Sequence, residues 1–468
     1  MTTINYRPVQ LSEQSKTILE HRYFLKDDDS NIIETPEELF ERVAKGVASI
    51  ETLYGTLPVE SELSANDFYD IMTNFEFVPN SPTLMNAGTK QGTLSACFVL
   101  PLEDSMEGIM KAATDSAMVQ KFGGGTGFAL SKLRPRGDTI KSTHGIACGP
   151  IEVLKTLSRV SSMITQGGKR DGANMAIMSI YHPDILDFIS CKAVEGDIHN
   201  FNISVGVDSH FMECVKHDLD YDLVNPKNLQ IVGRQNAREV FTKIVEGAWK
   251  NGEPGMIFLD NVNEDNKVQN EFGPMIATNP CGEQPLLPNE SCNLGSINLS
   301  KFYDEEIHDI QWNKLTKVTR TAVNFLDNVI DANYYATPAI EKMTKSTRKI
   351  GVGVMGFADL LIQLRIPYNS DEARQLGQNI MTHVKEVADK MSIELAAKRG
   401  PFPAWEDSSF DKITEVYRNA CRMTVAPTGT ISMISDCSSG IEPNFALAWK
   451  KQNILEGKTL IYLSLIHI

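Results

Sequence analysis

The sequence has no run of 18 apolar residues that could span a membrane, and its start, MTTINYRPVQLSEQSK, has no basic segment leading into an apolar one. Positive charge is also scarce: 45 lysines and arginines stand against 60 aspartates and glutamates, so the net charge is −15. Sequence-independent binding to DNA or RNA depends on lysine and arginine at phosphates, so we expect no nucleic-acid partner. A single nucleotide needs only local donors and stays open as a ligand. We expect a cytoplasmic protein with no membrane partner.

The eight cysteines form no CxxC pair and no cluster with histidine at zinc spacing, so we expect no metal site. They stand at positions 97, 148, 191, 214, 281, 292, 421 and 437. In a reducing compartment they begin as thiols, and we expect most of them to be small buried core residues. Any disulfide among them is then expected to be catalytic rather than structural.

Two helices are marked by their ends. Thr35, Pro36 and Glu38 form a start signal like a capping box. Apolar residues follow it at helical spacing, namely Phe40, Val43, Val47, Ile50 and Leu53. A second helix is predicted to begin at Ser370 and to end at Gly400. Its apolar face is formed by Ala373, Leu376, Ile380, Val384, Val387, Met391 and Leu395.

The rest of the chain alternates between strand-like and helix-like segments. The runs ACFVL, FNISVGV, LGSINL and RMTVA predict strands, and IEVLKTLSRVSSMI predicts a helix, which together indicate an α/β domain. We expect a helical domain over residues 1–75 and the α/β domain over 76–462. The last residues, 463–468, follow an unfinished polar segment, so we interpret them as an unrelated tail on a chain that is cut short.

Residues 279–299, NPCGEQPLLPNESCNLGSINL, predict a redox or radical site. Cys281 stands in a turn between a proline and a glycine, with the carboxylate of Glu283 two residues away, and Cys292 heads a strand-like run. Thiols are readily converted to radicals or disulfides, and a nearby carboxylate can move the proton that such chemistry releases. Cys292 and Cys97, taken singly, predict buried strand residues. A redox pair would require their Cα atoms to lie about 4.4 to 6.8 Å apart.

Several glycine-rich segments have competing interpretations. FGGGTG, residues 122–127, lets the backbone approach a ligand closely, or it is an ordinary tight turn. GxGxxG at 351–356 lacks a preceding apolar strand, which argues against a dinucleotide site. VAPTGTIS, residues 425–432, predicts a strand, a turn and a helix start suited to phosphate, or a plain loop. GGKRDGAN, residues 167–174, predicts a loop with two cations or a solvated surface loop. No Walker A motif is present.

Together these segments resemble the large catalytic chain of ribonucleotide reductases, over residues 20–462. The sequence of the Cys281 segment resembles that of the class II, adenosylcobalamin-dependent branch. The other markers are PNSPTLMNAG (79–88), SACFVLPLEDSMEGI (95–109), FGGGTGFALSKLRPRG (122–137), TQGGKRDGANMAIM (165–178) and VAPTGTISMISDCSSGIEP (425–443). The resemblance implies a ten-stranded α/β barrel of two antiparallel five-stranded halves with a central finger loop, preceded by a small helical N-terminal domain. We expect the barrel to be incomplete here, or one half of a split enzyme.

The resemblance also implies roles for residues. Cys281 would carry the thiyl radical, Glu283 would act as base, and Asn279 would bind the ribose hydroxyls. Cys97 and Cys292 would be the reducing pair. The substrate would be bound by Ser81, Ala96, Cys97, Gly125, Asn279, Cys281, Glu283, Pro427, Thr428, Gly429, Thr430 and Ile431. A deoxynucleoside triphosphate effector would bind at Asp104 and Arg134, with Lys169 and Arg170 relaying its signal.

The implied substrate is a ribonucleoside di- or triphosphate, the cofactor adenosylcobalamin, and the partners a thioredoxin-like reductant and a second copy in a homodimer. The C-terminal cysteine pair usual in the family is not in this sequence, nor is an additional N-terminal nucleotide-binding domain. Three alternatives stay open: a class I large subunit that needs a separate radical-generating chain, a nicotinamide dehydrogenase built on GVGVMG, and a non-catalytic nucleotide-binding fragment.

Overall fold

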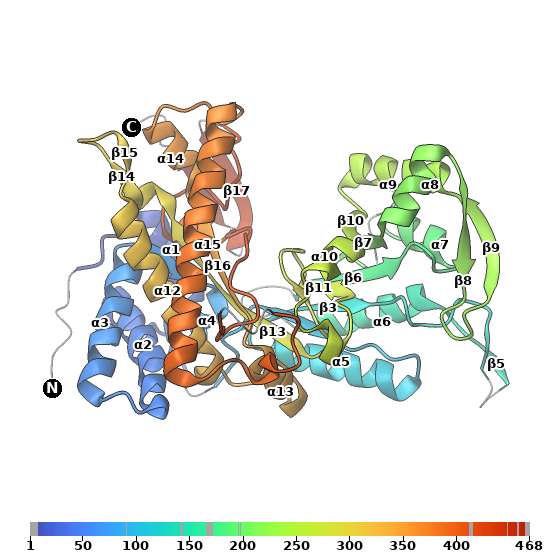
Figure 1. Cartoon of the computed structure of the whole chain (residues 1–468), viewed down its shortest axis with the longest axis horizontal. Coiled ribbons are helices and arrows are strands. Elements are labelled where there is room, and N and C mark those ends of the chain that lie inside the picture. The colour runs from blue at the N-terminus through green and yellow to red at the C-terminus, as the bar shows by residue number, and fades with distance from the viewer. Residues whose placement is uncertain are drawn as a thin grey trace.

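The fold is described from a computed structural model of the chain, shown in Figure 1. The structure describes residues 8–89, 91–140, 144–164, 172–194, 196, 198–410, 415–446, 448–455 and 458–463. Of the predicted tail 463–468, only Leu463 is in this part of the chain; residues 464–468 and the relay residues Lys169 and Arg170 lie outside it. Among the described helices, none is long and apolar enough to cross a membrane.

The N-terminal segment forms helices α1 (Glu13–Arg22), α2 (Pro36–Ala48) and α3 (Pro58–Thr73), with a 3-10 helix, η1 (Ser49–Tyr54), after α2. The predicted capping box is present: Glu38 N donates to Thr35 Oγ1 at 3.2 Å, and Thr35 N donates to Glu38 Oε2 at 2.8 Å. The prediction for Leu53 was wrong, because this side chain is 71% exposed. The α-helix ends at Ala48, and the tighter 3-10 turn shifts the spacing that would have buried Leu53.

The remaining helices lie outside the sheet and between its strands. They are α4 (Ser81–Asn86), α5 (Met106–Gln120), α6 (Pro150–Ser162), α7 (Ile185–Ser190), α8 (Ser209–His217), α9 (Ala237–Asn251), α10 (Leu259–Glu264), α11 (Gln269–Phe272), α12 (Trp312–Ala332), α13 (Pro338–Thr347), α14 (Phe357–Gln363), α15 (Asp371–Arg399) and α16 (Ile431–Ile434), with 3-10 helices η3 (Leu299–Phe302) and η4 (Pro403–Trp405). The helix predicted from Ser370 to Gly400 is α15, with Ser370 as its N-cap and Gly400 as its C-cap.

Eight strands form the main sheet of the described residues. They are β1 (Phe77–Pro79), β2 (Cys97–Leu100), β3 (Gly125–Ala129), β6 (Asn174–Ser179), β7 (Phe201–Val207), β10 (Gly255–Phe258), β13 (Glu290–Asn298) and β16 (Ile350–Met355). Two-stranded pairs are made by β4 (Thr139–Ile140) with β5 (Gly145–Ile146), β8 (Asp220–Val224) with β9 (Ile231–Asn236), β11 (Ala277–Thr278) with β12 (Pro285–Leu286), β14 (Tyr303–Asp304) with β15 (Asp309–Ile310), and β17 (Ala448–Leu455) with β18 (Lys458–Leu463).

Seven strands of the main sheet form two groups that run in opposite directions, and the short strand β1 lies antiparallel beside β13. Strands β2, β3, β6, β7 and β10 are parallel to one another. β13 is antiparallel to β2 but parallel to β16, so the second group begins at β13. This is the arrangement of antiparallel halves that the resemblance implied. In Figure 1, β13 lies between the long helices α12 and α15 and the strands β3, β6 and β7.

Two of the glycines at 351–356 allow close packing against β16. A Cβ added at Gly351 would lie 2.6 Å from Thr424 Cγ2, and one at Gly353 would lie 2.5 Å from the Thr424 carbonyl oxygen. Their missing side chains therefore let the segment around Thr424 lie against β16. The strand predicted for RMTVA is reduced to a bridge between Met423 and Val352.

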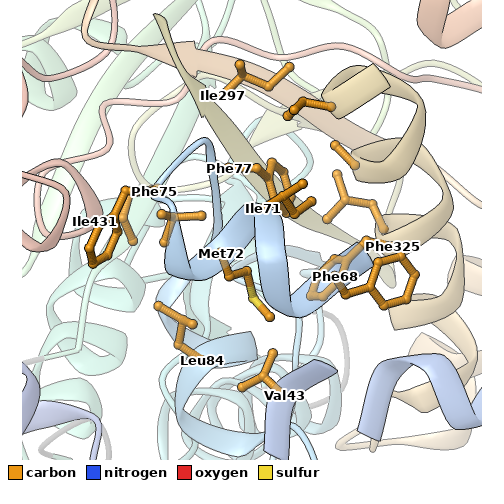
Figure 2. Close-up of a cluster of buried hydrophobic side chains, with 14 of the residues drawn as sticks. Val43, Phe68, Ile71, Met72, Phe75, Phe77, Leu84, Ile297, Phe325 and Ile431 are labelled. Atoms are coloured by element: carbon orange, nitrogen blue, oxygen red, sulfur yellow. The ribbon is translucent and has the colours of Figure 1, made fainter. Parts of the chain in front are cut away.

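One hydrophobic cluster joins the N-terminal helices to the sheet. Figure 2 shows Phe68 of α3 beside Phe325 of α12, with ring centroids 5.1 Å apart in an edge-to-face arrangement. Phe77 on β1 lies 5.6 Å from the same ring. Phe75 and Ile431 belong to this cluster as well, so the packing continues from the helices to the start of α16.

A buried ionic network stabilises the same junction. Asp327 on α12 has no exposed side-chain surface and lies 2.8 Å from both Arg348 and Arg399 and 3.4 Å from Arg418. The ring of Tyr54, from η1, stacks against the guanidinium groups of Arg399 and Arg418, with distances of 4.8 and 5.1 Å to its centroid. The network thus ties the N-terminal helices to segments that flank the second strand group.

Candidate active site

The hairpin of β11 and β12 carries the Cys281 turn and lies against β3 and β6. Two glycines of the FGGGTG segment make this approach possible. A Cβ at Gly127 would lie 1.7 Å from the Thr278 carbonyl oxygen, and one at Gly125 would lie 2.6 Å from Pro280 Cγ. The close approach predicted for this segment is therefore to the chain's own hairpin. We call residues 279–284, at the tip of the hairpin, the finger loop.

The finger loop is fixed by hydrogen bonds within itself. The main-chain N–H of Asn279 donates to the Gln284 carbonyl at 3.2 Å, and the N–H of Gln284 donates to Asn279 Oδ1 at 3.0 Å. Gly282 has φ of +86°, a conformation that favours glycine. These bonds close the turn and leave Cys281 exposed at its tip.

Each strand group also contributes a bond to the finger loop. Asn202 Nδ2, from β7, donates to the Pro280 carbonyl oxygen at 2.8 Å. Thr424 Oγ1, beside β16, donates to the Glu283 carbonyl oxygen at 3.1 Å. The residues on either side of Cys281 are therefore anchored to opposite halves of the sheet.

Cys97 and Cys292 are direct partners in the antiparallel pairing of β2 with β13. Opposed residues of such a pair have Cα atoms about 4.5 to 5.5 Å apart, which falls within the range that a disulfide spans. Both are thiols in this structure and both are buried. The strand register therefore gives the two cysteines the Cα–Cα separation that a disulfide requires, which the sequence alone could not show.

Polar groups of the finger loop contact both thiols. Asn279 Nδ2 lies 3.1 Å from Cys97 Sγ and 2.6 Å from Glu283 Oε2, and Glu283 Oε1 lies 3.8 Å from the same sulfur. Gln284 Nε2 donates to Cys292 Sγ at 2.9 Å. The finger loop therefore places a carboxylate beside one thiol and an amide donor beside the other.

Burial dominates the electrostatics of these groups. It raises the pKa of Cys97 well above its usual value, and the negative charge of Glu283 adds to that effect. Burial likewise raises the pKa of Cys292, against a hydrogen bond from Gln284 that lowers it. The pKa of Glu283 is raised by burial as well, opposed by the bond from Asn279. Both thiols therefore hold their protons at neutral pH.

A cavity of about 250 Å³ opens over these groups. It is lined by all twelve of the residues predicted to bind substrate: Ser81, Ala96, Cys97, Gly125, Asn279, Cys281, Glu283, Pro427, Thr428, Gly429, Thr430 and Ile431. The structure thus brings together in one place segments that the sequence separates by up to 350 residues, as counted from residue 81 to 431. Gly429 has open space around it, since a Cβ there would meet no atom within 4 Å.

The sequence did not indicate several residues of the cavity and its support. Asn80, Gly295 and Ser296 line it. Tyr23, the C-cap of α1, forms a 2.7 Å hydrogen bond with Ser81, and Arg22 Nη1 donates to Thr430 Oγ1 at 3.4 Å. Asn80 stands next to Ser81 in the PNSP segment, which was a usable signal. The contacts from α1 join residues that are far apart in the chain, and no signal in the sequence indicated them.

The predicted effector residues lie apart from the cavity. Arg134 Nε lies 2.8 Å from Asp104 Oδ2, and the main-chain N–H of Arg134 donates to Asp104 Oδ1 at 3.2 Å. Asp104 and Arg134 therefore contact each other, but neither residue lines the cavity. In the described part of the chain, no group of three or more histidine, cysteine, aspartate or glutamate side chains is placed to hold a metal ion.

The cysteines outside the site vary in burial. Cys214 is buried, Cys191, Cys421 and Cys437 are half-buried, and Cys148 is exposed. Burial raises the pKa of Cys191 to about 12. The expectation that most cysteines are buried was therefore wrong, since three of the eight are: Cys97, Cys214 and Cys292.

Comparison with known proteins agrees with this architecture. Residues 9–92 match the family model of the ribonucleotide reductase all-alpha domain, and residues 95–417 and 411–466 match that of the ribonucleotide reductase barrel domain. These matches confirm the predicted fold, an α/β barrel preceded by a helical domain.

Similar curated proteins include the vitamin B12-dependent ribonucleoside-diphosphate reductase of Thermoplasma acidophilum, 45% identical over 97% of this chain and 66% of its own length. The protein of the same name from Mycobacterium tuberculosis is 44% identical over 95% of this chain and 63% of its own length. The ribonucleoside-diphosphate reductase subunit alpha of Chlamydia muridarum is 28% identical over 96% and 49%. The chain thus spans at most about two thirds of these relatives. On the evidence of both domain models and of these identities, the chain belongs to the family of ribonucleotide reductase large subunits.

Proposed function

We propose that the chain reduces ribonucleotides to 2′-deoxyribonucleotides, the precursors of DNA, through a thiyl radical on Cys281. The observation that carries the proposal is the cross-strand pair of Cys97 and Cys292 beneath a finger loop that exposes a third thiol. The 44–45% identical relatives are named vitamin B12-dependent reductases of ribonucleoside diphosphates, which supports the class II assignment.

The cofactor that fits this proposal is adenosylcobalamin. Cys281 is exposed, and a Cβ at Gly282 would meet no atom within 4 Å, so a radical-generating group can approach the sulfur from that side. When bound, adenosylcobalamin would supply a carbon-centred radical, and the exposed Cys281 thiol would be the group that gives up a hydrogen atom to it. All later steps use the chain's own side chains.

The Cys281 thiyl takes the 3′ hydrogen atom of the ribose and returns a hydrogen atom at the end of the cycle. Glu283 accepts the 3′ hydroxyl proton, and its raised pKa suits a base that works near neutral pH. Asn279, bonded to Glu283 at 2.6 Å, orients the hydroxyls.

The thiol pair supplies the two reducing equivalents. Cys97 gives a proton to the 2′ hydroxyl, which leaves as water, and Cys97 and Cys292 together give two electrons and two protons and end as a disulfide. The balance is one ribonucleotide and two thiols for one deoxyribonucleotide, one water and one disulfide. Renewed turnover needs an external dithiol, which we propose is a thioredoxin-like protein.

The segment Pro427–Ile431 is proposed to bind the substrate phosphates. It lines the same cavity as the finger loop, and its hydroxyls and main-chain N–H groups are donors of the kind that phosphate oxygens accept from. Ser81 and Gly125 line the same cavity from the first half of the chain. Both a di- and a triphosphate are compatible with this donor set.

Regulation is proposed at Asp104 and Arg134, where a deoxynucleoside triphosphate would select the base that is reduced, in a homodimer, with Lys169 and Arg170 relaying the signal. Replacing Arg170 with alanine is expected to change which substrate each effector favours. Unchanged substrate preferences would refute this relay.

The test of the proposed function is deoxynucleotide formation by the purified chain with ribonucleotide, a dithiol and adenosylcobalamin, with and without a deoxynucleoside triphosphate. We expect product that depends on adenosylcobalamin and is abolished by Cys281→Ser. Cys97→Ser and Cys292→Ser are expected to allow abortive turnover at most. Normal turnover in any of these variants would contradict the roles assigned here.

A class I large subunit is the second candidate, because the Chlamydia relative, named a subunit alpha, matches 96% of this chain. It predicts product only after addition of a radical-generating chain. A nucleotide-binding fragment predicts effector binding without product under either condition.

A further inference from the structure

The two paired thiols differ in their access to the cavity. Cys97 lines the cavity, whereas Cys292 has no exposed surface and does not line it. The Cys292 sulfur instead lies 3.6 Å from the main-chain carbonyl oxygen of Lys349, the residue before β16. An external thiolate that enters the cavity therefore meets the sulfur of Cys97 first.

The two sulfurs also differ in the charge that surrounds them. Cys97 Sγ lies 3.8 Å from the carboxylate of Glu283, and its one amide donor, Asn279 Nδ2, is shared with that carboxylate. Negative charge on Cys97 is therefore opposed.

Cys292 has a more favourable setting for negative charge. Gln284 Nε2 donates to its sulfur at 2.9 Å, and the side chain of Gln284 is only 4% exposed. The ammonium of Lys349 also favours the thiolate, but Glu290, its ion-pair partner at 2.8 Å, opposes the thiolate more strongly. The Gln284 amide is therefore the main group that favours negative charge on Cys292. A buried amide donor stabilises a developing anion without rearrangement of solvent.

From these observations, and on the basis of the proposed function, we propose that Gln284 makes Cys292 the leaving thiolate when an external dithiol cleaves the Cys97–Cys292 disulfide. Attack then occurs at Cys97, and the Gln284 amide is the donor that stabilises the departing sulfur. This assigns Gln284 a part in regenerating the enzyme, distinct from the steps on the nucleotide.

The exchange balances without further reactants. A thiolate of the dithiol attacks Cys97 Sγ, the bond between the two cysteine sulfurs breaks, and Cys292 leaves with the electron pair and then takes a proton from solvent. The second thiol of the reductant, as thiolate, attacks the mixed disulfide at the reductant's own sulfur. Cys97 leaves as a thiolate and is protonated, and the dithiol ends as a disulfide.

The direction of attack is tested on the intact chain after oxidation with diamide. The oxidised protein is mixed briefly with 2-mercaptoethanol, quenched in acid and alkylated with N-ethylmaleimide in denaturant, and its peptides are analysed by mass spectrometry. We expect 2-mercaptoethanol on the Cys97 peptide and maleimide on the Cys292 peptide. The reverse labelling, or equal labelling of the two, would overturn the assignment.

The role of Gln284 is tested by the rate at which dithiothreitol reduces the same disulfide. Gln284→Met keeps the length of the side chain and all main-chain bonds but removes the donor. We expect reduction about tenfold slower, the effect of losing one hydrogen bond to a charged group. Gln363→Leu is the matched control, because the Nε2 group of Gln363 donates to the Ser300 carbonyl at 3.2 Å, away from the thiols. It is expected to leave the rate unchanged.

Gln284→Glu separates a donor from a packing role. A carboxylate cannot donate to sulfur, whereas the protonated acid can, so the rate relative to the unsubstituted chain is expected to rise as the pH falls. A wild-type rate in Gln284→Met, or a pH-independent ratio in Gln284→Glu, would refute the inference. If diamide forms no Cys97–Cys292 disulfide in the unsubstituted chain, the proposed function and this inference both fail; if the disulfide forms, only the inference is at stake.

Discussion

Asn202 on β7 donates a 2.8 Å hydrogen bond from Nδ2 to the carbonyl oxygen of Pro280, the residue before Cys281. The bond joins the first strand group to the finger loop, whose other side is bonded to Thr424 beside β16. The position of the Cys281 sulfur is therefore set by both halves of the sheet rather than by the turn alone.

Removing this anchor is expected to impair catalysis more than stability. In Asn202→Ala we expect deoxynucleotide formation to fall about 10- to 100-fold, because displacements near 1 Å can misalign reacting atoms. The free energy of unfolding should change by less than about 1 kcal/mol, because Asn202 is exposed. Asn228→Ala, at an exposed turn, is the control. Wild-type turnover in Asn202→Ala, measured beside thermal unfolding, would show that the finger loop does not need the anchor.

Gly127 is expected to tolerate no side chain. A Cβ there would lie 1.7 Å from the Thr278 carbonyl oxygen, so Gly127→Ala must displace β11 and with it the finger loop. We expect a loss of about 1 to 3 kcal/mol in the free energy of unfolding, as for other overpacked cores, and little or no deoxynucleotide formation. Gly196→Ala is the control, since a Cβ at Gly196 would meet no atom within 4 Å. Equal stability and activity of the two variants would contradict the close packing of β11 on β3.

Asp327 is expected to dominate the junction between the N-terminal helices and the sheet. Burial acts to raise its pKa, but the charges of Arg348, Arg418 and Arg399 outweigh burial and hold the pKa at about 2. Asp327→Ala leaves these guanidinium groups without their shared carboxylate, and we expect a loss of about 3 to 5 kcal/mol in denaturant unfolding.

A matched surface pair and the pH dependence check that prediction. Asp222→Ala removes an exposed partner of Arg234 and should change the free energy of unfolding by less than about 1 kcal/mol. Because the folded pKa of Asp327 is depressed, its contribution is complete above the ordinary pKa of 3.8 and is lost as the pH falls toward about 2. A similar loss in both variants, or a loss in Asp327→Ala that does not shrink in this range, would refute the central role of this carboxylate.

Local signals predicted the elements well. The caps at Thr35 and Ser370 depend on residues within a few positions of each other, and both are present in the structure. Leu53 failed because a 3-10 turn, which the spacing does not reveal, follows Ala48. The segment around Met423 failed as a strand because its pairing depends on a distant partner, Val352.

The site was predictable where its chemistry lies in short segments. The finger loop carries Cys281 and Glu283 within three residues, and the resemblance supplied ten further residues that line the cavity. Strand register, which opposes Cys97 to Cys292, and the anchor at Asn202 depend on how distant strands pair. No spacing in one sequence encodes that pairing, so these contacts could be found only in the folded chain.

The acid limb of the pH–rate profile is expected to report Glu283. Burial raises the pKa of this carboxyl above its usual 4.5, and the proposed base must be ionised, so deoxynucleotide formation should decline as the pH falls through a value above 4.5. A raised folded pKa also means that the folded chain binds this proton more tightly, so the contribution of Glu283 to stability decreases as the pH rises from 4.5 through the folded value. In Glu283→Gln we expect turnover to be lost. The free energy of unfolding of this variant should no longer show the decrease with rising pH that Glu283 causes. Turnover that persists in Glu283→Gln with its acid limb unchanged would assign the limb to another group and remove Glu283 as the base.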